Sequence, residues 1–127
     1  MNELTKAEEQ VMRYVWKLEK AFLKDIVEQF PDPRPAYTTI STVVRVLVKK
    51  GFLEFEQFGK IRQYAPAVSK KDYFQQHFNS VVKNFFSGSK SKFANFFTED
   101  KDMDVKELEE IKKIVEDKIE KLKKDGN

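Results

Sequence analysis

One stretch of the chain places hydroxyl and cationic side chains at helical spacing, with no carboxylate among them. Read at 3.6 residues per turn, the segment from Tyr37 to Lys50 carries them on its outer side: Thr38, Thr39, Ser41, Thr42, Arg45 and Lys49. Short hydroxyls and cations approach phosphates and base edges closely and donate hydrogen bonds to both. The pattern predicts a helix that contacts DNA, with Arg45 as the leading candidate for a guanine or phosphate contact.

The inner side of the same segment predicts burial. Ile40, Val43, Val44 and Leu47 follow the i, i+3, i+4, i+7 spacing of a core-facing stripe. A solvated, β-branched helix side is the alternative to a DNA-contacting one. The local charge favours DNA, because six Lys and Arg side chains between residues 34 and 62 stand against two Glu.

Two shorter helices are expected before this segment. Thr5 and Glu8 have the spacing of a capping box, which starts a helix that runs to about Lys20. The segment Leu23–Phe30 reads as a second helix, and three prolines between residues 31 and 35 end it. These two helices are expected to form the scaffold that supports the helix from Tyr37 to Lys50.

After Gly51 the hydrophobic period changes from 3.6 to 2. Two short strands, residues 53–58 and 61–65, are expected around a tight turn at Gly59 and Lys60. Three helices followed by a hairpin is the order of a winged helix-turn-helix domain, which we assign to residues 1–67. Lys60 on this wing is expected to contact a backbone phosphate, whereas Arg62 either contacts DNA or points across the strand.

Residues 68–127 are expected to form helices that dimerise. Helical patterns span about residues 69–86, 90–97 and 104–124, and seven of the twelve Phe residues lie after Pro66. Three helices can bury little of that surface alone, so a second copy is the expected cover; folding back onto the N-terminal domain is the alternative. The predicted dimerisation residues are Phe78, Val82, Phe85, Phe93, Phe96, Leu108, Ile111 and Val115.

The composition argues against an enzyme. There is no Cys and a single His, and the chain has no Gly-rich phosphate loop. We therefore expect no catalytic residues, no metal and no cofactor. No apolar run reaches 18 residues and the N-terminus is charged, so we expect a cytoplasmic protein without direct membrane binding.

Several segments together resemble the penicillinase repressor family of bacterial transcriptional regulators, and the resemblance covers nearly the whole chain. The matching segments are Leu4–Glu8, Trp16, Tyr37–Thr42, Arg45–Gly51, Tyr64–Pro66, Phe85–Ser89 and Ala94–Phe96. The resemblance implies a winged-helix DNA-binding domain and a helical dimerisation domain that together occupy an inverted-repeat operator. Two departures bear on the operator sequence: Ser41 stands where relatives often have Arg, and the wing reads Gly59-Lys60 where Gly-Arg is common.

The resemblance also implies regulation by proteolysis. In related systems a membrane-bound zinc metalloprotease senses a β-lactam, and the repressor is cut at an Asn-Phe bond in its dimerisation domain. Asn95 and Phe96 lie at the matching place.

The sequence thus predicts a mainly α fold with a small β-hairpin that acts as a homodimeric repressor on double-stranded operator DNA. A winged-helix adaptor that binds other proteins, without sequence-specific DNA binding, is the alternative.

Overall fold

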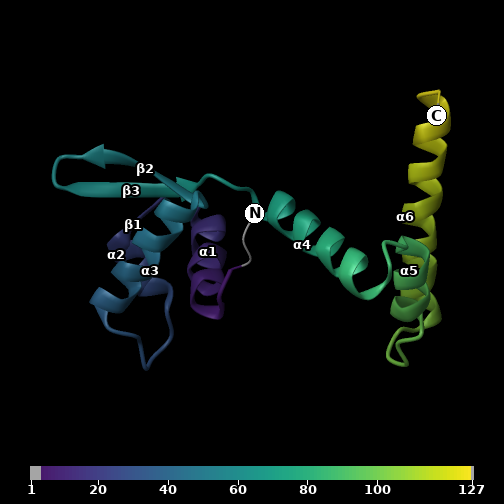
Figure 1. Ribbon diagram of the computed structural model, residues 1–127, viewed down its shortest axis with the longest axis horizontal. Helices are drawn as coiled ribbons and strands as arrows, with labels where there is room; N and C mark the ends of the chain where they lie inside the picture. Colours follow the sequence, from purple (N-terminus) through teal and green to yellow (C-terminus); the bar gives the residue numbers. More distant parts are fainter. Residues whose placement is uncertain (1–3, 127) are drawn as a thin grey trace. The chain divides into compact units, whose positions relative to one another are not determined.

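The computed structural model describes residues 4–126 and forms two compact units, the first extending to residue 78 and the second beginning at residue 79. The fold is mainly helical with a small antiparallel sheet, as predicted. Figure 1 shows the elements along the chain: α1 (Lys6–Leu18), β1 (Ala21–Phe22), α2 (Leu23–Gln29), α3 (Tyr37–Lys50), β2 (Leu53–Phe58), β3 (Ile61–Pro66), α4 (Lys70–Phe85), α5 (Lys90–Thr98) and α6 (Val105–Lys124).

The first unit has the expected winged-helix order of elements. The residues at the helix ends explain where α1 begins and where α3 ends. The hydroxyl of Thr5 accepts from the backbone N–H of Glu8 at 3.2 Å, and the Glu8 carboxylate accepts from the N–H of Thr5 at 3.0 Å. This capping box starts α1. Gly51 ends α3 with φ 86° and ψ 13°, the left-handed conformation that glycine adopts without strain.

The structure adds a third strand to the predicted hairpin. Ala21 and Phe22 form β1, which pairs antiparallel with Tyr64 and Gln63 of β3. The strand order is β1-β3-β2, so β3 lies in the centre. The segment between α1 and α2 is therefore fixed to the wing, which protrudes past the helices in Figure 1.

The core of this unit lies between the helices and one face of the sheet. It is built from side chains that are almost fully buried: Val11, Met12, Val15, Ala21, Ile26, Phe30, Ile40, Val44, Leu47, Phe52, Leu53, Tyr64 and Tyr73. The inner stripe predicted for α3 is confirmed, since three of its four members belong to this core and Val43 packs against it.

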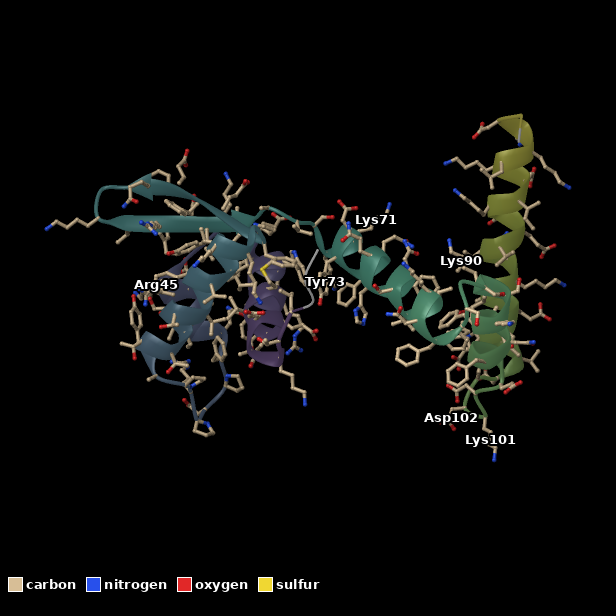
Figure 2. The ribbon with its side chains drawn as sticks, viewed as in Figure 1. Arg45, Lys71, Tyr73, Lys90, Lys101 and Asp102 are labelled. Carbon is tan, nitrogen blue, oxygen red and sulfur yellow. The ribbon has the colours of Figure 1, made fainter. Side chains whose placement is uncertain are left out.

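The first turns of α4 also belong to this core. Tyr73 is 5% exposed, and its hydroxyl accepts from the backbone N–H of Leu4 at 3.3 Å. Trp16 is half-buried, and its indole N–H donates to the carbonyl of Val68 at 2.9 Å. Tyr73 is labelled in Figure 2 at the start of α4. The predicted domain boundary at residues 67 and 68 stays a prediction.

The second unit leaves most of its apolar side chains uncovered. Among residues 79–126, Val82 is the only hydrophobic residue that is buried. Phe86 contacts Phe93 and Phe96 with ring centroids 5.5 and 5.6 Å apart, which joins the end of α4 to α5. The large apolar residues that remain exposed are Phe85, Phe96, Phe97, Val105, Leu108, Ile114, Val115, Ile119 and Leu122.

Within residues 4–126, no helix combines the length and the apolar character needed to cross a membrane.

Candidate nucleic-acid interface

A groove of about 800 Å³ separates α3 from the β2–β3 hairpin. One wall is α3, the other is the hairpin, and the segment from Phe22 to Asp25 closes one side. Four cations and one carboxylate line it: Lys24, Arg45, Lys60, Arg62 and Asp25. The groove is therefore electropositive and open to an extended anion.

The α3 wall consists of one stripe of side chains spaced by four residues. Tyr37, Ser41 and Arg45 line the groove. The other predicted contact residues of α3 are exposed but do not line it: Thr38, Thr39, Thr42 and Lys49. The structure thus divides the predicted face into a stripe turned to the wing and a neighbouring stripe turned to solvent.

The hydroxyl of Thr42 orients Arg45. The hydroxyl of Thr42 donates to the carbonyl of Thr38 at 2.9 Å, and Nη2 of Arg45 donates to the Thr42 hydroxyl at 3.3 Å. In Figure 2, Arg45 projects from α3 on the side of the hairpin. The remaining donors of the guanidinium are available for a phosphate or a guanine edge.

The hairpin wall contributes both predicted wing cations. Lys60 occupies the turn, where Gly59 adopts a φ of 61°. Arg62 lies on β3 directly opposite Gln57 of β2, and its Nε donates to Oε1 of Gln57 at 3.3 Å. Arg62 therefore contacts the opposite strand and also lines the groove, and its contact with DNA stays a prediction.

Tyr37 is a groove residue that sequence reasoning missed. It is 56% exposed and begins α3, four residues before Ser41 and eight before Arg45. Extending the outer stripe back by one helical turn identifies it. An exposed tyrosine offers both a hydroxyl and an aromatic face to a nucleic acid.

Two of the six cations between residues 34 and 62 bind other groups of the same chain. Arg34 donates from Nε to the carbonyl of Phe30 at 2.8 Å, and Lys50 pairs with the buried carboxylate of Glu8 at 2.8 Å. The pKa of Glu8 is the net of opposing effects. Burial acts to raise it, but hydrogen bonds from Lys50 and Thr5 and the charge of Lys50 outweigh burial and lower the pKa below its ordinary value.

The predicted dimerisation residues differ in exposure. Phe85 is 78% exposed, and Phe96, Leu108 and Val115 are also exposed. Val82 is buried within the chain, and the others are half-buried: Phe78, Phe93 and Ile111. The exposed members are those that a second copy can cover.

The predicted cleavage site lies inside α5. Asn95 is exposed and Phe96 is 65% exposed. The hydroxyl of Thr98 donates to the carbonyls of Ala94 and Asn95 at 2.8 and 3.2 Å. The side chains of both residues are accessible. The peptide bond between them lies within α5, so this part of the helix must unwind before the bond can enter a protease cleft.

Comparisons with known proteins bear on both units. Residues 4–117 match the family model described as penicillinase repressor. The penicillinase repressor of Bacillus licheniformis is 24% identical over 116 residues, which cover 91% of each chain. The methicillin resistance regulatory protein MecI of Mammaliicoccus sciuri is 28% identical over 117 residues, which cover 91% of this chain and 95% of that protein.

The fold of the first unit also has a solved counterpart. The solution structure of the DNA binding domain of the repressor BlaI aligns with a TM-score of 0.50 and 26% identity, over 56% of this chain and 88% of that chain.

Proposed function

The chain belongs to the penicillinase repressor family, and we propose that it binds double-stranded operator DNA as a homodimer through the groove between α3 and the wing. The family consists of DNA-binding transcriptional repressors and not of enzymes, so the chain is a transcriptional repressor. We place its action in the cytoplasm, at the bacterial operator.

The observation that carries the DNA-binding site is the placement of two guanidinium groups on opposite walls of one groove. Arg45 comes from α3 and Arg62 from β3, and both line the same groove as Lys60. A recognition helix in the major groove brings a wing onto the adjoining backbone, so one wall reads bases while the other holds phosphates. Thr38, Thr39, Thr42 and Lys49 extend the contact surface along α3.

A homodimer is supported by the uncovered apolar residues of the second unit. Residues 79–126 bury a single hydrophobic side chain while nine large ones stay exposed. Monomeric proteins rarely expose apolar surface on that scale, and a second copy of the same chain supplies a matching surface. The dimer would present two copies of α3 to the two halves of an inverted repeat.

Proteolysis at Asn95-Phe96 is proposed as the route of inactivation, with a membrane-bound metalloprotease as the sensor. A cut there removes α6 and the end of α5 from the DNA-binding unit. These segments carry eight of the nine exposed apolar residues, so each monomer is left to bind a single half-site.

In vitro selection of DNA duplexes with the full-length protein tests the proposal. We expect an inverted repeat whose half-sites lie about one helical turn apart, ~34–36 Å, as a dimer with two recognition helices requires. A selected single half-site would contradict the homodimer. Recovery of no shared motif would contradict operator binding and favour the adaptor function.

A further inference from the structure

Arg62 does not extend freely from the hairpin. Its Cζ lies 4.2 Å from the centroid of the Phe55 ring, and its Nε donates to Oε1 of Gln57 at 3.3 Å. Gln57 is the direct cross-strand partner of Arg62, and Phe55 is its diagonal neighbour on the same face of the sheet. A cation over an aromatic face and a hydrogen bond at Nε together fix the plane and the reach of the guanidinium.

The two partners of Arg62 are themselves held in place. Nε2 of Gln57 donates to the carbonyl of Gly59 at 2.9 Å and to that of Ile61 at 3.3 Å, so this side chain spans the turn of the wing. The Phe55 ring meets Tyr64 edge to face with centroids 6.1 Å apart, and Tyr64 is 7% exposed. Arg62 is thereby linked through Gln57 to the turn and through Phe55 to the core.

The outer end of the guanidinium is left available. Among the residues that the structure describes, the hydrogen bond to Gln57 engages Nε, and no hydrogen bond or ion pair engages either Nη atom. These two nitrogens carry four of the five N–H donors of an arginine. Asp25, the one carboxylate in the groove lining, already accepts from the backbone N–H of Phe22 at 2.9 Å.

We propose that Arg62 is a preformed ligand for one phosphate of the DNA backbone, and that Phe55 and Gln57 are positioning residues that act through it. This inference rests on the proposed function of the groove as a DNA-binding site. A planar guanidinium fork matches a phosphate in two hydrogen bonds. Because the side chain is already ordered, binding loses less rotamer entropy, which is worth roughly 2- to 12-fold in affinity.

Lys60 provides the internal comparison. It lies two residues away on the same wing and lines the same groove, but the structure gives its ammonium group no partner among residues 4–126. A flexible lysine acts on phosphates as a point charge. Loss of Phe55 should therefore weaken the contribution of Arg62 and leave that of Lys60 unchanged.

A double-mutant cycle on the full-length protein tests the inference. The probe is a duplex recovered by in vitro selection, and affinity is measured by fluorescence anisotropy over a series of salt concentrations. We expect Arg62→Ala to make the dependence of log affinity on log salt concentration less steep, by about the amount that one phosphate contact contributes. Phe55→Leu should lower affinity about 2- to 12-fold with the slope unchanged, because the charge remains. It should cause no further loss when Arg62→Ala is present.

Two controls separate positioning from general damage. Thermal unfolding of Phe55→Leu reports on the fold, and Gln57→Ala should give the same dependence on Arg62 without removing an aromatic ring. The losses from Phe55→Leu and Lys60→Ala should add.

Three results would overturn the inference. An equal loss from Phe55→Leu with and without Arg62 shows that Phe55 acts independently of it. An unchanged affinity and salt slope for Arg62→Ala shows that Arg62 holds no phosphate. Failure of the wild-type protein to select any duplex would overturn both the proposed function and this inference. Duplex binding with additive losses from Phe55→Leu and Arg62→Ala would overturn the inference alone.

Discussion

Lys50, in the last turn of α3, donates to both carboxylate oxygens of Glu8, in the first turn of α1, over 2.8 and 2.9 Å. The Glu8 side chain is 8% exposed and that of Lys50 is 27% exposed. The same carboxylate also caps α1 through the N–H of Thr5. This ion pair fixes the C-terminal end of α3 to the start of α1, and it engages Lys50 within the chain while its sequence neighbour Lys49 stays exposed.

Loss of Lys50 should destabilise the first unit. In Lys50→Met the carboxylate of Glu8 stays buried without its charged partner, so we expect the free energy of unfolding to fall by about 1–3 kcal/mol. Lys49→Met is the matched control, since Lys49 is exposed, and it should change stability by less than about 0.5 kcal/mol. Urea unfolding measures both. Equal effects of the two substitutions would contradict a structural role for the ion pair.

Stability should depend on pH through Glu8. Its pKa is lower in the folded chain than its ordinary value of 4.5, so the folded state favours the ionised carboxylate. This contribution is fully present above pH 4.5 and is lost as the pH falls below that value and through the lowered pKa. Glu8→Gln should be less stable near neutral pH, and the difference from wild type should shrink in acid. A difference that stays constant with pH would count against this linkage.

The helices and their ends could be predicted because their signals are local. The capping box at Thr5 and Glu8 depends on a few adjacent residues, and α3 has the predicted bounds. Strand β1 was missed, because two residues carry no periodicity and its pairing with Gln63 and Tyr64 is set by tertiary contacts.

Four of the predicted contact residues line the groove, but their arrangement could not be predicted from the sequence: Ser41, Arg45, Lys60 and Arg62. Arg45 and Arg62 could be named from charge and spacing, but a sequence does not show that both line one groove. Lys49 and Lys50 are adjacent cations, and their separate roles depend on a carboxylate 42 residues from Lys50. The position of Arg62 over Phe55 follows from strand register, which the sequence pattern did not fix.

A charge placed on the exposed face of α6 should break the proposed homodimer. Val115 is 51% exposed, and Val115→Glu would bury a carboxylate against the partner copy without a counter-ion. Analytical ultracentrifugation should show a shift from dimer to monomer. Lys106→Glu, at an exposed polar position on the opposite side of α6, should leave the dimer intact. A monomeric wild-type protein at the same concentration would refute the dimer.

Removal of the chain after Asn95 should imitate the proposed cleavage. The truncated protein keeps α1–α4 but loses α6 and most of the exposed apolar residues. We expect it to be monomeric and to bind duplexes with one and with two half-sites equally well, whereas the full-length protein prefers two. The two duplexes are compared in gel shifts. A truncated protein that retains the preference for two half-sites would exclude this route of inactivation.

The binding affinity of Arg45→Ala for a selected duplex tests the central claim most directly. We expect the loss of one base or phosphate contact from α3 to weaken binding by about 1–3 kcal/mol, while the variant remains folded and dimeric. Arg13→Ala is the matched control, because Arg13 is an exposed arginine on α1, outside the groove. Fluorescence anisotropy with the three proteins should show a loss for Arg45→Ala alone. An affinity for Arg45→Ala equal to that of wild type would contradict the assignment of α3 and its groove as the DNA-binding site.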